Sequence, residues 1–164
     1  MRTYKEFVAR LNTEIYPQVK KLRLLYLKEI NNFNRVWYQT AKFTEEVSEF
    51  SVALIENKSC GGKYKYPDIR GTYESEAADV ILSGILLCVV MGIQVNERYT
   101  SEIEDIAVAT SSMLQWASLA EVSKVFNRTY NIMRERKIDL MEHVKTRLCF
   151  NKKLLSEEKK VINA

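Results

Sequence analysis

Apolar residues along this chain recur mostly at spacings of three and four, which is the period of an α-helix. The densest apolar stretch is 73–93, which is hydrophobic on almost every side and reaches Gly92, a usual residue for a helix end. A helix that is hydrophobic all round belongs in the middle of a bundle. The pattern therefore predicts a central helix at about 73–92.

The first region with a helical pattern is 3–34. It contains Pro17, and proline is tolerated at the start of a helix but not inside one. We therefore predict a short helix at 3–15 and a second helix at 17–34.

Three further regions complete the helical pattern. One helix is expected at 36–57. Another is expected at 101–137, where Ser118 with Glu121 three residues later resembles a helix start and could divide the segment in two. The last helix should start at Asp139, and the charged tail after Ser156 should fray.

The segment between the helix at 36–57 and the central helix is a glycine-containing loop. Thr72 or Ser75 can cap the central helix. The loop is also basic, because it carries Lys58, Lys63, Lys65 and Arg70.

The chain of 164 residues has only 5 glycines and 2 prolines, which favours an all-α fold. We predict one domain over 1–164, a helical bundle completed by oligomerisation, with an extra helical segment at about 94–136. The net charge of +4 is too mild for a dedicated nucleic-acid binder.

Three cysteines far apart in sequence indicate a reducing compartment, and Cys88 has the pattern of a core residue. The longest apolar run, 80–93, is shorter than the roughly 20 residues of a membrane span. We expect a soluble cytoplasmic protein without a membrane partner. His143 is interpreted as a surface residue, and Trp116 as a core or subunit-interface residue.

Acidic residues lie beside apolar faces on two neighbouring helices. Glu46 and Glu49 share one helix face, and Glu76 and Asp79 share another, since residues three apart point the same way. If the helices pack antiparallel, four carboxylates converge, and such a cluster repels itself unless a cation is present. An all-oxygen cluster favours Mg²⁺ or Mn²⁺ over Zn²⁺. Each pair alone is more typical of a solvated helix face than of a metal site. The two pairs together, with the basic loop between them, are as typical of a metal site as of surface charge.

Two motifs carry a resemblance to a known family. E-E-V-S-E from Glu45 to Glu49, followed by E-A-A-D-V from Glu76 to Val80, resembles the paired motif of the MazG-like all-α nucleoside triphosphate pyrophosphohydrolases. The closing stretch is also similar: Arg147 matches the family's basic position and Asn151 its asparagine. Leu154 departs from the pattern, because the family often has arginine there. The resemblance covers about 36–93 and 137–154.

The resemblance implies Mg²⁺-dependent hydrolysis of a nucleoside triphosphate to the monophosphate and pyrophosphate. It also implies a homodimer or homotetramer with sites built partly from neighbouring subunits. Glu46, Glu49, Glu76 and Asp79 would bind the metal. Glu45 would either orient the attacking water or face solvent.

Further residues are expected to contact the substrate. Trp37, with Phe33 and Tyr38 behind it, is the candidate slot for the base, unless it packs in the core. The candidate phosphate ligands are Lys63, Lys65 and Arg70 from the loop, and Arg147, Asn151 and Lys153 from the last helix.

Other functions stay open at this stage. The chain could be a non-catalytic helical dimerisation or adaptor protein whose acids are surface charges. It could also act on phosphoribosyl-ATP, which the related fold can hydrolyse. The basic face at 20–28 permits nucleic-acid binding, but the sequence contains no stacking platform for bases.

Overall fold

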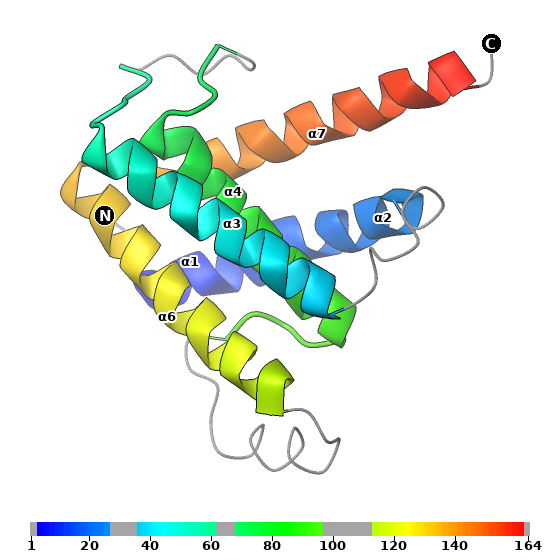
Figure 1. Cartoon of the computed structure of the whole chain (residues 1–164), viewed down its shortest axis with the longest axis horizontal. Helices are drawn as coiled ribbons and strands as arrows, with labels where there is room; N and C mark the ends of the chain where they lie inside the picture. The colour runs from blue at the N-terminus through cyan, green and yellow to red at the C-terminus, as the bar shows by residue number, and fades with distance from the viewer. Residues whose placement is uncertain (1–2, 27–35, 62–67, 97–112, 163–164) are drawn as a thin grey trace.

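The computed structural model describes residues 3–26, 36–61, 68–96 and 113–162. Every regular element in these ranges is helical, which confirms the all-α class (Figure 1). The elements are α1 (Tyr4–Arg10), η1 (Leu11–Ile15), α2 (Tyr16–Tyr26), α3 (Val36–Ile55), α4 (Tyr73–Met91), α6 (Met113–Glu135) and α7 (Leu140–Ile162).

Helix α4 is the centre of the bundle. The Thr72 hydroxyl accepts a hydrogen bond from the Ser75 amide at its start, and Gly92 ends it with φ of 73°. Its side chains are buried along most of its length, and α3, α7, α2 and α6 all pack on it. The prediction of a central buried helix is therefore confirmed, and Cys88 lies in its core with 0% exposure.

The first helical region does not divide at Pro17. Helices α1, η1 and α2 follow one another without a gap from Tyr4 to Tyr26. The predicted break was wrong because η1 is a wider π-helical turn directly before the proline. A π turn shifts the hydrogen-bond register, so the helix can absorb a residue that lacks an amide hydrogen. The remainder of the predicted second helix, 27–34, lies outside the described residues.

One prediction about the later helices was also wrong. Helix α6 is continuous through Ser118, so no new helix starts there. Serine is a frequent N-cap residue, but it is also tolerated inside a helix. Helix α7 extends to Ile162, and the fraying expected after Ser156 stays a prediction. Its predicted start is confirmed, since the Asp139 carboxylate accepts a hydrogen bond from the Met141 amide at 3.0 Å. The proposed helix start at Ser101 lies outside the described residues.

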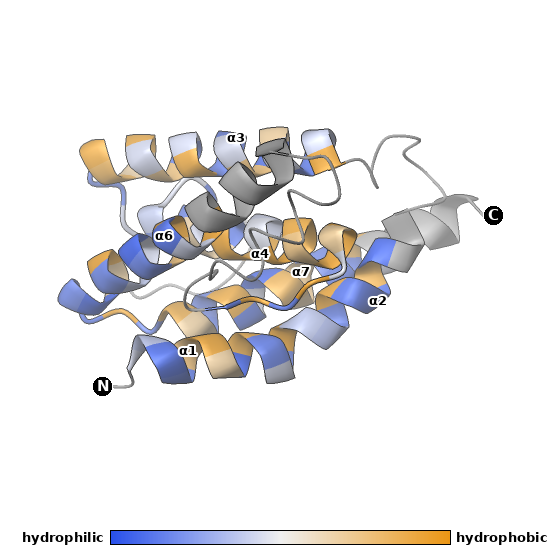
Figure 2. Cartoon of the chain, turned by 90° about the horizontal axis from the view of Figure 1, so that it is seen from below, coloured by the Kyte–Doolittle hydropathy of each residue, from blue (hydrophilic) through white to orange (hydrophobic). Residues whose placement is uncertain are grey.

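The helices form layers, with α3 at one edge of the bundle and α1 at the opposite edge (Figure 2). The apolar interior between these layers includes Phe43 of α3 and Phe126 of α6, whose ring centroids lie 6.4 Å apart. Gly84 of α4 lies directly against the Phe126 ring. Among the described residues, no helix is both long and apolar enough to cross a membrane.

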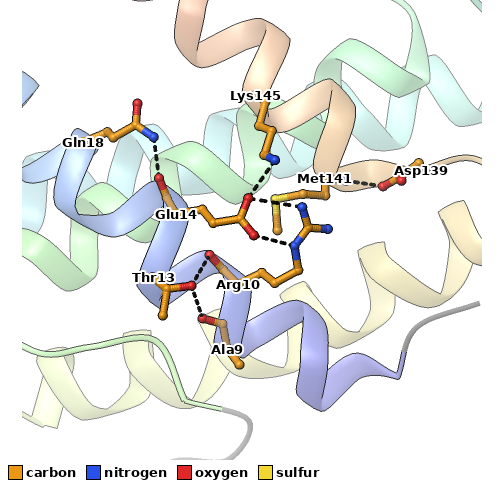
Figure 3. A network of polar contacts seen from close by, with 8 residues as sticks. All are labelled: Ala9, Arg10, Thr13, Glu14, Gln18, Asp139, Met141 and Lys145. Carbon is orange, nitrogen blue, oxygen red and sulfur yellow. Dashed lines mark hydrogen bonds and ion pairs between the residues drawn. The ribbon is translucent and has the colours of Figure 1, made fainter.

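An ionic network joins the N-terminal helices to α7 (Figure 3). The Glu14 carboxylate accepts hydrogen bonds from Arg10 at 2.6 Å and pairs with Lys145 of α7 at 2.7 Å. These two partners hold the pKa of Glu14 at about 2. The network links the N-terminal helices to α7, which carries several of the candidate substrate-binding residues.

His143 is a buried residue of α7, with 2% exposure. The prediction of a surface position was wrong, because α7 packs on α4 along the face that His143 shares with Leu140 and Val144. Burial lowers the pKa of His143, and the neighbouring Glu74 carboxylate opposes that shift.

Candidate functional site

Three of the predicted acids come together where α3 packs on α4. Glu46 and Glu49 of α3 and Glu76 of α4 each offer a carboxylate oxygen, and these oxygens lie within 4.8 Å of one another. The two helices pack antiparallel (Figure 1), so that the motif on one faces the motif on the other. We call Glu46, Glu49 and Glu76 the carboxylate triad.

The three carboxylates differ in their surroundings. Glu76 is buried, and its Oε1 atom accepts hydrogen bonds from the Gly71 amide at 2.9 Å and the Ser75 hydroxyl at 3.1 Å. Glu46 is half-buried and Glu49 is exposed. The loop end at Gly71 therefore fixes Glu76, while α3 brings the two other acids to it.

Electrostatic strain accompanies this arrangement. Burial, followed by the charge of Asp79, raises the pKa of Glu46 to about 7. Burial and the charge of Glu76 raise the pKa of Glu49 as well. Both shifts mean that negative charge is unfavourable here in the absence of a compensating cation.

Asp79 is not part of the triad. Its Oδ1 atom forms an ion pair with Arg147 Nε of α7 at 2.5 Å. Burial raises the pKa of Asp79 to about 6 although Arg147 opposes the shift. The helix spacing alone predicted that Asp79 would join Glu76, but an arginine 68 residues later in the chain holds it instead.

Glu45, the remaining acid of the first motif, is exposed. It pairs with Lys42 at 2.5 Å, and Lys42 also lies 3.7 Å from Glu46. The sequence analysis missed Lys42, although its position three residues before Glu45 and four before Glu46 on one helix could have identified it.

A hollow of about 570 Å³ opens over the triad, and we call it the acidic hollow. Its lining includes Lys42, Glu45, Glu46, Glu49, Glu56, Lys58, Arg70, Gly71, Glu76, Asp79 and Arg147. The guanidinium groups of Arg70 and Arg147 lie 5.9 and 5.7 Å from the centre of the Phe150 ring. Two arginines from different parts of the chain thus meet at one side of the hollow.

A second hollow of about 290 Å³ shares four residues with the first, and we call it the leucine hollow. Its lining is Val19, Leu22, Arg23, Tyr38, Gln39, Lys42, Glu46, Asp79, Leu82, Ser83, Leu86, Arg147, Leu148 and Asn151. The shared residues are Lys42, Glu46, Asp79 and Arg147. The two hollows therefore meet at the Asp79–Arg147 pair.

The remaining predicted contacts are distributed unevenly. Trp37 is 62% exposed and lines neither hollow, whereas its neighbour Tyr38 lines the leucine hollow. Asn151 also lines the leucine hollow, and Lys153 is exposed and lines neither. Lys63, Lys65 and Phe33 lie outside the described residues, as does the side chain of Trp116.

The donor set suits a hard divalent cation. Mg²⁺ and Mn²⁺ prefer oxygen ligands, and the triad supplies three carboxylates from two rigid helices. Comparison of the chain with protein-family models, with curated proteins and with solved structures gave no match. The functional interpretation therefore depends on the residues and their geometry.

Proposed function

We propose that this chain is a Mg²⁺-dependent nucleoside triphosphate pyrophosphohydrolase of the MazG-like all-α type. The observation that carries the proposal is the carboxylate triad, whose oxygens lie within 4.8 Å of one another beneath a hollow that two arginines also line. Acids that can hold a cation and arginines that can bind phosphates both suit the hydrolysis of a phosphoanhydride.

Glu46, Glu49 and Glu76 would hold the metal, with Mn²⁺ as a substitute for Mg²⁺. The raised pKa of Glu46, at about 7, supports this assignment, because a bound cation would stabilise the charged form. Bound there, magnesium would neutralise charge on the phosphates and lower the pKa of a water molecule.

Arg70 and Arg147 would bind the phosphate oxygens, since guanidinium groups recognise phosphate through paired hydrogen bonds. Lys58 also lines the acidic hollow, but it pairs with Glu56 at 2.5 Å and has no assigned role in phosphate binding. Attack by water on a phosphorus of the triphosphate would release pyrophosphate and leave the monophosphate. Glu45 would orient this water only after separating from Lys42, so we favour a solvent-facing role for it.

The nucleoside would occupy the leucine hollow. Leu22, Leu82, Leu86 and Leu148 supply an apolar surface, and Tyr38 supplies an aromatic one. Gln39 and Asn151 add amide groups that can hydrogen-bond a base or sugar. Because this hollow joins the acidic hollow, one substrate can place its base and its phosphates in the two spaces. Tyr38, rather than Trp37, is thus the aromatic candidate for the base.

The proposal includes a homodimer or homotetramer. Trp37, Val52 and Ile55 are 62%, 52% and 84% exposed on α3, which is more apolar surface than a helix usually leaves in water. A second copy of the chain covering this face would remove it from solvent. We expect the activity in the cytoplasm.

The test is a panel assay of the purified protein with Mg²⁺ and each common nucleoside triphosphate, measuring released pyrophosphate. Glu49→Gln and Glu76→Gln should each lower the rate by at least about 100-fold, since ligand loss exceeds the effect of outer-shell changes. Glu56→Gln is the matched control, because Glu56 borders the same hollow but pairs with Lys58. Equal activity in all three variants would refute the proposal.

A second candidate function is a non-catalytic adaptor, which the exposed apolar side chains of α3 favour. In that case the triad is surface charge. The adaptor predicts no pyrophosphate release with any nucleotide and no rise in melting temperature with Mg²⁺, whereas a metal site stabilises the fold as ligand concentration grows.

A further inference from the structure

The Asp79–Arg147 pair occupies the boundary between the two hollows. Its two side chains are only 13% and 17% exposed, and the charged atoms lie 2.5 Å apart. Water screens the attraction between charges little at this depth, and either partner left alone here would be a buried charge without compensation. In the chain without ligands, Asp79 is therefore paired with Arg147.

Asp79 nevertheless lies within electrostatic reach of the triad. It follows Glu76 by three residues on the same face of α4, and its charge raises the pKa of Glu46. Its side chain lines the acidic hollow together with all three triad residues. A cation bound by the triad would attract this fourth carboxylate, provided that Arg147 gave it up.

Arg147 has an alternative partner in a phosphate group. It lines the acidic hollow beside Arg70, and both guanidinium groups lie against the Phe150 ring. A guanidinium that binds phosphate through two donors cannot also keep a full ion pair with Asp79. The cation would attract Asp79 and the phosphate would attract Arg147, so each ligand favours separation of the same ion pair.

We propose that Arg147 and Asp79 form an exchange pair that couples cation binding to phosphate binding. Without substrate, Arg147 holds Asp79 away from the triad. Phosphate groups draw Arg147 toward themselves, and Asp79 then joins Glu46, Glu49 and Glu76 around the cation. This inference rests on the proposed function and makes Arg147 a positioning residue for Asp79 as well as a phosphate ligand.

The exchange has a thermodynamic consequence. Alone, the cation binds through the triad without Asp79, and phosphate binds weakly because it competes with Asp79 for Arg147. Together they bind with positive coupling, and the coupling must be equal in both directions. Typical coupling of this kind changes affinity by about 5–150-fold.

The first test uses pyrophosphate without any divalent cation, with binding measured by isothermal titration calorimetry in a chelator. Asp79→Asn removes the carboxylate that competes with the anion for Arg147, and should tighten pyrophosphate binding about 10-fold. Glu45→Gln is the matched control, because it removes the same charge from the same hollow but contacts Lys42. It should tighten binding less than about 2-fold. Equal effects in the two variants would overturn the proposal.

The second test measures Mg²⁺ affinity without phosphate in a double-mutant cycle. Asp79→Asn should weaken Mg²⁺ binding less than about 3-fold in the wild-type background, but more than about 10-fold in the Arg147→Gln background. Arg70→Gln serves as the control background, since Arg70 lines the same hollow without the pairing to Asp79. The same loss in every background would show that Asp79 is an ordinary ligand or no ligand, and would overturn the exchange.

The outcomes separate this inference from the proposed function. If the wild-type chain releases pyrophosphate from nucleotides while both binding tests fail, the exchange is wrong and the function stands. If both binding tests succeed while no nucleotide is hydrolysed, the exchange is right and the function is wrong. Helical circular dichroism checks each variant, and if Arg147→Gln does not fold, the result for Asp79→Asn in the pyrophosphate test decides.

Discussion

At the scale of single residues, Glu76 is the best-fixed member of the carboxylate triad. It is 7% exposed, and both the Gly71 amide and the Ser75 hydroxyl donate to its Oε1 atom. A glutamine at this position can accept the same hydrogen bonds through its carbonyl oxygen. Glu76→Gln therefore removes the charge while retaining the local structure, which makes it the clearest variant for isolating the role of the cluster.

Gln39 provides a prediction about substrate choice. It is 1% exposed, lies two turns before Glu46 on α3, and lines the leucine hollow. Gln39→Leu should change the ratio of kcat/KM between nucleotides by about 10-fold or more, because a site built on hydrogen bonds discriminates strongly. Mg²⁺ affinity should stay unchanged. Thr44→Val on the exposed face of α3 is the control, and an unchanged ratio in Gln39→Leu would remove the nucleoside from this hollow.

Glu14 provides a prediction about pH. Its pKa is lowered to about 2 in the folded chain by Arg10 and Lys145. A carboxylate with a lowered pKa stabilises the fold above its ordinary pKa of 4.5, and this contribution is lost as the pH falls through about 2. Because Glu14 is a third exposed, screening reduces the contribution to about 1 kcal/mol.

The measurement is urea unfolding at several pH values between 5 and 2. Wild-type stability should fall across this range more than that of Glu14→Gln, which has no carboxylate to protonate at this position. Glu135→Gln, at the exposed end of α6, should follow the wild type. Parallel curves for wild type and Glu14→Gln would contradict the assigned role of the network.

The sequence was a good guide to residues that are close along one helix and a poor guide to distant partners. The three-residue spacing correctly predicted that Glu46 and Glu49 lie on one face. No local pattern could reveal that Arg147 pairs with Asp79, since this contact depends on how α7 crosses α4. The burial of His143 also depends on how α7 packs on α4. Its sequence neighbours, the charged Glu142 and the apolar Val144, do not indicate which side of the helix is buried.

At the scale of elements, the close approach of α4 and α6 depends on a missing side chain. A Cβ atom added at Gly84 would lie 2.4 Å from Phe126 Cε1 and 3.0 Å from Phe43 Cε2. The two rings thus occupy the space beside the glycine. This contact brings α3, α4 and α6 together behind the site, so it supports the position of the acidic helices.

Gly84→Ala should therefore destabilise the fold. The added methyl group forces the Phe126 ring to move, and overpacking of this kind costs about 1–3 kcal/mol. Chemical denaturation is the measurement, with Ser83→Ala on the same helix as the control, since Ser83 is half-buried at the leucine hollow. A Gly84→Ala variant as stable as the wild type would mean that the contact is loose.

Helix boundaries were predicted well where a capping residue marks them. They were predicted poorly where a single proline or serine was taken as a sufficient sign of a boundary. Thr72, Gly92 and Asp139 mark real helix ends. Pro17 did not end its helix, because the π turn at 11–15 accommodates it. Ser118 did not start one, because a serine with a later glutamate is also compatible with a helix interior.

At the scale of the whole molecule, the outer face of α3 carries three of the large apolar side chains that are exposed among the described residues. Ile55 is 84% exposed, and Val52 and Trp37 are more than half exposed. Val52 also lines the acidic hollow, so this apolar surface extends to the triad. An interface on the outer face would therefore stiffen the helix that carries two of the three acids.

Ile55→Glu should shift the chain toward the monomer, because a charge buried in an apolar interface is strongly unfavourable. Sedimentation velocity across a range of protein concentrations measures the change. Lys58→Glu, which places a similar charge just beyond the helix, is the control. A wild-type chain that is monomeric at every concentration would exclude the proposed oligomer.

The all-α class followed from composition and periodicity, and the structure confirms it. What composition could not predict is how the two hollows meet, because that junction is formed by side chains from α3, α4 and α7.

Anomalous diffraction from crystals grown with MnCl₂ tests directly whether the carboxylate triad binds a divalent cation. We expect a metal peak at about 2.1–2.2 Å from oxygens of Glu46, Glu49 and Glu76. A crystal with manganese bound elsewhere, or with none at these three side chains, would contradict it.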